Sequence, residues 1–380
     1  MNEPLTLPSS AERWMNRIER TRGSCIDWNM ASGHIWVARM VAVWLIVASN
    51  ACAEESSDWR IEILNEHGIP TDTAALEKKQ KNHSISAEIL NEKIKLLASE
   101  KFAEREQAQK DVLMMGKDVL PMILALPTSD DPEVRMRLGK ILISLQADGR
   151  WNRQALVRRA IESLLHERKN PGIADPQGEL FVECFKTEKA SLSDGYRRLG
   201  FKAPDGLIGS VSNGAARFRG NHATEGDQRL ILRARDFSRK QEFPDTFRIE
   251  SKIGGAAGGQ GTYHVGISIG NVRALFHPGY PGGAFRFERV DNNVMLVQNT
   301  NMGFNPPVDQ LLLMSIEVKR LAEGNVSLDV TVNSAGHQFQ KSAIIKAADI
   351  GKLETIGLDR SGRSGGDGLF DDFIVDFKKP

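Results

Sequence analysis

Two different hydrophobic periods divide this chain. Between residues 86 and 169 apolar residues recur every three or four positions, as on one face of an α-helix. After residue 180 apolar and polar residues alternate, which is the period of a half-buried β-strand. The stretch between them, residues 170–179, concentrates Asn, Asp, Pro and Gly and has no such period. The pattern predicts a helical subdomain over 54–169, a linker over 170–179 and a β-domain over 180–380.

The helical subdomain contains one well-marked helix start. Residues 129–135 read Ser-Asp-Asp-Pro-Glu-Val-Arg, which offers an Asp cap, a Pro at the first helical position and an acid in the first turn. Short amphipathic helices joined by tight turns, one opened by Asp-Pro-Glu-Val-Arg, resemble the HEAT-like repeats of bacterial proteins over residues 86–147. The resemblance implies scaffolding or protein contact. Since about three repeats are needed for a continuous core and one is complete, we expect a capped subdomain or a plain helical bundle rather than an array.

The β-domain is a series of short alternating runs with no helices between them. Turn residues that tolerate positive φ separate the runs, as at Gly270-Asn271 and at residues 291–293. This organisation predicts an antiparallel sandwich. Strands are expected at 229–235, 247–253, 263–269, 272–276, 285–290, 312–318, 326–332 and 373–377.

The end of the chain carries a family resemblance. Residues 367–375, Asp-Gly-Leu-Phe-Asp-Asp-Phe-Ile-Val, are interpreted as a turn leading into a closing strand with Phe373, Val375 and Phe377 on one face. They resemble the closing strand of laminin G-like and concanavalin A-like lectin/glucanase domains, preceded as there by a strand at 355–358. The resemblance implies an α+β protein in which the helices precede an antiparallel jelly-roll sandwich. Because this sandwich hosts lectins, adhesion modules and glycoside hydrolases alike, it bears on fold more than on activity.

The first 53 residues are interpreted as an export signal. An apolar run at 40–48 follows Arg39 and leads into Ala51-Cys52-Ala53, a small-x-small cleavage site that ends at Ala53. The run is shorter than the about 20 apolar residues of a bilayer-spanning helix. The alternative is an uncleaved anchor, and Met30 or Met40 is a candidate for the true start. We therefore expect an exported protein, whether periplasmic, at the cell surface or secreted, with membrane attachment only if the signal is retained.

Charge and cysteine content narrow the functional classes. The formal net charge of +1 gives no electrostatic footprint for nucleic acid, so no nucleic-acid partner is expected. Of three cysteines, only Cys184 follows the expected cleavage site, and its apolar neighbours favour a small buried residue over a reactive thiol. The Gly-rich run at 254–261 lacks the strand-then-helix context of a phosphate loop. We expect a hairpin tip there and no nucleotide site.

No catalytic signature occurs in the sequence. Glycoside hydrolysis needs two carboxylates, and the glucanases of the resembled fold place them along one strand as Glu-x-Asp-x-Glu. No such run is present, and the odd spacing of Glu288 and Asp291 puts them on opposite faces of a regular strand. All six Trp residues lie at or before Trp151, so none is available in the β-domain to stack on a sugar. We expect a non-enzymatic binding or adhesion protein that contacts glycans or another protein, with a glycoside hydrolase or related carbohydrate-active enzyme as the alternative.

One polar face is the candidate ligand site. If the apolar residues of 263–269, 272–276 and 285–290 point inward, the polar ones share the opposite surface of three consecutive strands. The alternative is an ordinary solvated sheet face. The candidate ligand-binding residues are His264, Arg273, His277, Arg286 and Glu288.

A structural Ca²⁺ is the one cofactor that the sequence suggests. Asp367, Asp371 and Asp372 place three carboxylates within six residues, and sandwiches that resemble this one often hold Ca²⁺ near that edge. Calcium takes six to eight oxygens, so these acids would supply only part of its shell. The alternative is that they cap a turn through bonds to nearby backbone amides.

Overall fold

The computed structural model describes residues 58–82, 87–147, 149–186, 192, 197–198, 201–202, 209–220, 227–238, 240–256, 263–334, 336–362 and 366–377. These residues fall within one compact unit, Glu55–Pro380. The expected export signal and its cleavage site at Ala53 lie outside them. No helix in the described part of the chain combines the length and apolar character needed to cross a membrane.

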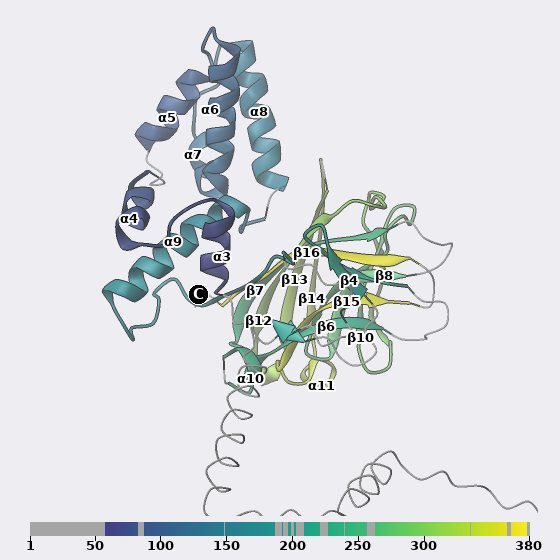
Figure 1. The fold of residues 1–380 in the computed structure, drawn as a ribbon. Helices are drawn as coiled ribbons and strands as arrows, with labels where there is room; N and C mark the ends of the chain where they lie inside the picture. Colours follow the sequence, from purple (N-terminus) through teal and green to yellow (C-terminus); the bar gives the residue numbers. More distant parts are fainter. Residues whose placement is uncertain are drawn as a thin grey trace, which may run out of the picture. The chain divides into compact units, whose positions relative to one another are not determined.

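The helical region has the expected position and ends where the sequence pattern changes. The cap is confirmed, since the Asp131 carboxylate accepts a hydrogen bond from the Glu133 backbone N–H at 2.8 Å and the helix begins at Pro132. The likeness to HEAT-like repeats stays a prediction. The elements, shown in Figure 1, are α3 (Trp59–Glu66), α4 (Thr73–Asn82), α5 (Ala87–Leu96), α6 (Phe102–Met114), η1 (Gly116–Val119), α7 (Leu120–Leu124), α8 (Pro132–Ala147) and α9 (Arg153–Lys169).

The helices belong to two apolar cores. Helices α5 to α8 pack around residues such as Val112 and Ile141. Helices α3, α4 and α9 form a second core, which continues into the β-domain through Leu180 and Val182 of the first strand and through Cys184 directly after it. Cys184 is buried, and burial raises the pKa of its thiol, so the prediction of an inert buried cysteine is confirmed.

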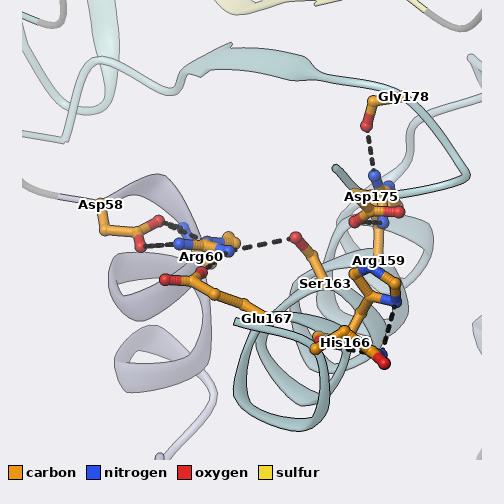
Figure 2. Close-up of polar contacts among 9 residues, drawn as sticks. Asp58, Arg60, Arg159, Ser163, His166, Glu167, Asp175 and Gly178 are labelled. Atoms are coloured by element: carbon orange, nitrogen blue, oxygen red, sulfur yellow. Dashed lines mark hydrogen bonds and ion pairs between the residues drawn. The ribbon is translucent and has the colours of Figure 1, made fainter. Parts of the chain in front are cut away.

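Polar contacts tie the linker and α3 to helix α9. Arg60 of α3 pairs with Asp58 at 2.5 Å and with Glu167 of α9 at 2.6 Å. Arg159 of α9, only 5% exposed, pairs with Asp175 at 2.7 Å and donates to the carbonyl of Gly178 at 2.6 Å (Figure 2). The segment 170–179 is therefore held against α9 rather than hanging free.

The β-domain is a sandwich of two antiparallel sheets, as predicted. Sheet A has the strand order β14-β13-β12-β7-β16-β5-β4, with β1 also pairing with β16. Sheet B has the order β11-β10-β9-β8-β15-β6-β3-β2. Their inner faces share one core, which includes Ile249 from sheet A and Ile267 from sheet B. Short helices α10 (Ala234–Phe237), η2 (Ala322–Gly324) and α11 (Ala347–Ile350) lie in the connections.

The bounds of β6, β8, β9 and β10 agree with the sequence pattern to within two residues, whereas β1 to β5, β11 and β14 were not predicted. Sheet A contains β1 (Leu180–Glu183), β4 (Gly209–Ser212), β5 (Ala215–Phe218), β7 (Thr246–Ala256), β12 (Leu312–Arg320), β13 (Val326–Ser334), β14 (His337–Ile345) and β16 (Asp367–Asp376). Sheet B contains β2 (Arg197–Arg198), β3 (Phe201–Lys202), β6 (Gln228–Arg233), β8 (His264–Ile269), β9 (Val272–Phe276), β10 (Ala284–Arg289), β11 (Met295–Asn301) and β15 (Thr355–Ser361).

The closing strand is longer than expected. Phe373, Val375 and Phe377 do enter the core, but β16 already begins at Asp367, where the sequence suggested a turn. A bulge causes the difference: Asp371 pairs with Lys252 and Ile374 with Glu250, so β16 carries one extra residue there. Asp372 occupies the bulge with φ 49°. The extra residue breaks the alternation, which hides the first half of the strand from a period-2 pattern.

The Gly-rich run is also partly strand. Gly254 and Gly255 belong to β7 and pair with β16, which corrects the expected hairpin tip at this end of the run. A Cβ on Gly254 would lie 2.2 Å from the Gln310 carbonyl oxygen, so glycine is required by the close approach of two backbones. The rest of the run, 257–261, lies outside the described residues.

Candidate functional site

The candidate ligand residues do share one face of sheet B. In the register of β9 and β10, Glu288 stands opposite Arg273, and in that of β8 and β15, Ser361 stands opposite His264. The apolar residues that alternate with them, such as Val265, lie in the core between the sheets. The face assignment made from alternation is therefore confirmed for β8, β9 and β10.

This face is hollowed into a pocket rather than laid open to solvent. The pocket has a volume of about 920 Å³. Four of the five candidate ligand residues line it, namely His264, His277, Arg286 and Glu288. The sequence did not identify other lining residues, which come from β11, from the end of β15 and from loops: Tyr280, Asn293, Asn299, Thr300, Asn301 and Ser361.

Arg273 is the exception, and its expected exposure was wrong. Its side chain is 0% exposed and lies behind the pocket lining instead of in it. It pairs with Glu288 at 2.6 Å, with Asp227 at 2.7 Å and with Asp359 at 3.3 Å. A guanidinium can be buried here because three carboxylates compensate its charge. Arg273 is therefore placed to position Glu288 and Asp227, which do line the pocket.

The charged groups around Arg273 shift one another's pKa values. Burial alone would lower the pKa of Arg273, but attraction to Asp359, Asp227 and Glu288 outweighs burial and raises that pKa. Burial raises the pKa of Asp359, and Arg273 opposes this shift. The cluster is a compact ion network whose members depend on one another.

Glu288 is shared between two arginines. Its Oε1 lies 2.6 Å from Nε of Arg273, and its Oε2 lies 2.7 Å from Nε of Arg286. Both carboxylate oxygens thus lie beside a guanidinium nitrogen, but the Arg286 Nε contact is an ion pair without hydrogen-bond geometry. Among the described residues, Glu288 is the only ion-pair partner of Arg286, so the outer edge of the Arg286 guanidinium is left for the pocket. Burial lowers the pKa of Arg286.

Two histidines stand side by side in the pocket wall, with ring centroids 5.0 Å apart. Burial lowers the pKa of His264 to about 2, and repulsion from Arg286, His277 and Arg273 adds to the shift. Burial also lowers the pKa of His277. The His277 Nδ1 lies 2.8 Å from the Pro278 carbonyl, which can only accept, so Nδ1 carries the proton and Nε2 is an acceptor. Both rings are neutral at pH 7.

Tyr280 supplies an aromatic surface at the pocket. It is 49% exposed, and its ring centroid lies 5.3 Å from that of His277. It belongs to the loop between β9 and β10, where Gly279, Gly282 and Gly283 adopt positive φ. The loop returns tightly through these glycines, which brings Tyr280 next to β9. A half-exposed tyrosine ring can stack on a sugar in the absence of tryptophan.

The three aspartates of β16 are engaged by cations and amides. Asp367 accepts from Arg217 Nε at 2.6 Å and from the Gly220 N–H at 2.8 Å. Asp372 pairs with Arg153 at 2.7 Å and with Lys252 at 2.8 Å. The described residues contain no group of three or more His, Cys, Asp or Glu side chains that could hold a metal ion.

Asp371 differs from the other two. Its Oδ1 accepts from the Asp372 N–H at 2.8 Å, a local bond of the kind expected for a turn residue. Burial, with repulsion from Asp372, raises its pKa to about 6. This one bond is local, as the turn-capping alternative expects, but Asp371 lies within strand β16 and not in a turn. Calcium binding stays a prediction, which calorimetry with Ca²⁺ on chelator-treated protein would test.

Comparison with known proteins gives no family for this chain. No family model matches it, and neither does any curated protein sequence. Solved structures similar to part of it include alginate lyase Aly36B in complex with alginate trisaccharide, at 7% identity and a TM-score of 0.36 over 54% of this chain and 100% of that one. The Emp47p carbohydrate recognition domain is similar at 12% identity and a TM-score of 0.32, over 54% of this chain and 99% of that one. A xylan beta-1,4-xylosidase from Bacillus halodurans C-125 is similar at 11% identity and a TM-score of 0.38, over 55% of this chain and 40% of that one. Similarity of this order says nothing about chemistry, so the function proposed below comes from the residues of this chain alone.

Proposed function

We propose that this protein binds a glycan in the pocket of sheet B without turning it over. The observation that carries the proposal is the pocket lining, which combines many uncharged hydrogen-bonding groups with one half-exposed aromatic ring. The side chains of Asn299, Thr300 and Asn301, with the neutral imidazoles, match the donors and acceptors of sugar hydroxyls. The Tyr280 ring offers a surface for the apolar face of a sugar. A volume of about 920 Å³ suits a short oligosaccharide.

Binding is favoured over hydrolysis by the state of the carboxylates. Hydrolysis requires one carboxylic acid that can give a proton to the leaving group. Both oxygens of Glu288 are held by Arg273 and Arg286, and Asp227 is paired with Arg273. Glu288 therefore has both oxygens beside a guanidinium, whereas Asp227 is paired through Oδ2 alone. The pairing of Glu288 supports the proposal of binding rather than cleavage.

A second candidate function is a glycoside hydrolase or a related carbohydrate-active enzyme. One observation favours it: Asp227 and Glu288 both line the pocket and both contact the guanidinium of Arg273. Two neighbouring carboxylates in a pocket are the minimal requirement for glycoside hydrolysis. A ligand that displaced Arg286 from Glu288 would free one carboxylate oxygen.

The wider setting of the binding function rests on the sequence. The signal-like segment before Ala53 favours export, and the closing strand favours a laminin G-like or concanavalin A-like module. A protein ligand is the other partner compatible with such a module. The helical region is proposed to be HEAT-like and to serve as a scaffold.

A glycan array, combined with polysaccharide hydrolysis assays on the same preparations, tests the proposal. We expect binding to a subset of glycans and no turnover. Loss of binding in Asn299→Ala with Asn301→Ala, at unchanged melting temperature, would place the ligand in this pocket. Turnover that Glu288→Gln abolishes would instead establish the hydrolase, and the exposed Glu317→Gln variant on sheet A serves as its control.

A further inference from the structure

We propose that the ligand of this pocket is a carboxylated sugar, whose carboxylate is bound by Arg286. The inference rests on the proposed glycan-binding function and narrows the ligand class to glycans that contain uronate or a comparable acid. It follows from the geometry of one guanidinium, from the neutral side chains beside it and from the way the acidic residues are already paired.

Arg286 contacts Glu288 through the inner edge of its guanidinium, in an ion pair without hydrogen-bond geometry, and is open at its outer edge. Its Nε meets Oε2 of Glu288 at 2.7 Å, and only 18% of the side chain is exposed. No other ion-pair partner occurs for it in the described part of the chain. A planar guanidinium held in this way presents paired N–H donors that match the two oxygens of a carboxylate. Because the group is largely withdrawn from water, such a pair is stronger than one on an open surface.

The acidic residues of the pocket do not oppose an anion as strongly as their number suggests. Asp227 and Glu288 both pair with Arg273 behind the pocket lining. Glu288 must therefore serve two arginines, and Arg286 has only a share in one counter-ion. A ligand carboxylate would give Arg286 a counter-ion of its own.

The histidine side of the pocket is also suited to an anion. His264 is 6% exposed, and its Nδ1 has no hydrogen-bond partner among the described residues. The charged groups that shift its titration are all basic: Arg286, His277 and Arg273. At pH 7, where both rings are neutral, the positive charges that act on His264 are those of Arg286 and Arg273. The unpartnered Nδ1 marks a polar atom that a ligand hydroxyl could satisfy.

The charge present suits a carboxylate better than a doubly charged group. Arg286 is the one Lys or Arg side chain that lines the pocket within the described residues. A phosphate monoester or a cluster of sulfates usually recruits several cations. A single guanidinium beside two neutral imidazoles fits one planar, singly charged carboxylate.

The test compares sugars that differ only in charge. A glycan array would carry oligouronates, each next to its carboxyl-reduced neutral form, together with sulfated versions of the same neutral oligomers. Calorimetry on the best pair would then measure both affinities for the wild-type protein. We expect the carboxylated form to bind at least tenfold more tightly than the neutral form.

Three variants attribute that preference to Arg286. Arg286→Gln should bring the affinity for the oligouronate close to that for the neutral form. Arg286→Lys, which keeps the positive charge but lacks the paired N–H donors of the guanidinium, should retain part of the preference. Arg289→Gln on the same strand, whose partner is the exposed Asp291, should retain all of it. Melting temperatures of the three variants check that each is folded.

The outcomes separate this inference from the proposed function. Equal binding of carboxylated and neutral forms by the wild-type protein would overturn the carboxylate proposal and leave glycan binding intact. A preference for the sulfated oligomers would also overturn it. Binding of no glycan by a folded protein would overturn both proposals.

Discussion

Arg273 and Glu288 stand opposite each other on β9 and β10, and neither exposes more than 1% of its side chain. Arg273 also compensates Asp227 and Asp359, so its removal would leave buried carboxylates without a counter-ion. We expect Arg273→Ala to lower the free energy of unfolding by about 3–5 kcal/mol, measured by urea denaturation.

The same burial changes what a double variant should do. Residues on an exposed sheet face usually tolerate replacement within about 0.5 kcal/mol. On a solvent-exposed face, the double variant Arg273→Ala with His277→Ala would be expected to keep its stability. Because Arg273 is buried, we expect the double variant to destabilise this protein. Arg289→Ala, which breaks an exposed pair with Asp291, is the matched control and should stay within that limit. An unchanged melting temperature in Arg273→Ala would contradict the ion network.

Tyr280 is expected to contribute to ligand affinity but not to stability. Its ring is half exposed at the pocket, and it packs only partly against His277. Tyr280→Ala should weaken glycan binding by about tenfold, or about 1.4 kcal/mol, with little change in melting temperature. Tyr280→Phe keeps the ring and should lose less affinity. Calorimetry with the glycan chosen from the array measures both, and equal affinities for all three proteins would rule out stacking.

His264 should make the protein sensitive to acid. Its pKa is lowered to about 2 by burial, whereas a histidine in an unfolded chain has a pKa of about 6.5. Between these values the unfolded chain binds a proton that the folded protein excludes. Stability from the neutral ring is therefore complete above about pH 6.5 and is lost progressively as the pH falls, by up to about 1.4 kcal/mol per pH unit.

Urea denaturation of wild type and His264→Gln between about pH 6.5 and pH 4.5 measures this contribution. The variant cannot take up the proton, so its free energy of unfolding should decline less steeply than that of the wild type. Ser361→Ala lines the same pocket without titrating and should keep the wild-type slope. Parallel profiles for all three proteins would show that His264 is not the source.

Glu250 is expected to hold the connection between α8 and α9 on sheet A. Its carboxylate accepts from the backbone N–H groups of Arg150 at 3.0 Å and Trp151 at 3.1 Å, and 2% of the residue is exposed. Glu250→Ala should cost about 1–3 kcal/mol, because these bonds are lost together. It should also speed proteolysis of the connection at residues 149–152.

A nearby carboxylate provides the control for this connection. Glu317 pairs with Arg248, as Glu250 does, but its side chain is 53% exposed and it does not contact the connection. Glu317→Ala should leave the proteolysis rate unchanged. If both variants are cut equally fast, the connection is held by other contacts, such as the bond from Trp151 Nε1 to Asp376.

Sequence patterns predicted strands from both half-buried and fully buried positions. Val272–Phe276 agrees residue for residue although all five residues are buried. The patterns missed β1 to β5, which are two to four residues long, and β11 and β14, which lie at the edges of their sheets and carry mostly polar residues. Their pairing is set by neighbouring strands, which a local pattern does not contain.

The candidate site was predicted in part for the same reason. Alternation placed His264, His277, Arg286 and Glu288 on one face, and all four line the pocket. The burial of Arg273 depends on Asp227 and Asp359, which are distant in sequence. The local alternation of apolar and polar residues could not predict contacts with them. Asn299 was likewise hidden in an edge strand. Tyr280 could have been identified as a pocket residue from its position between glycines in a loop next to the candidate strands.

Because β16 contains one extra residue, its core-facing positions change from even to odd residue numbers at the bulge. Before the bulge, even-numbered Phe370 enters the core, and after it, odd-numbered Phe373 does so. Even-numbered Asp372 and Ile374 then turn toward α9, where they meet Arg153 and the second apolar core. Deleting Asp372 would restore a regular ladder in which both halves of β16 keep their pairing with β7 and their inner face. What would be lost is the carboxylate that contacts Arg153 of α9 and Lys252 of β7. The inserted residue thus gives the strand a contact with the helices without changing which side chains fill the sandwich.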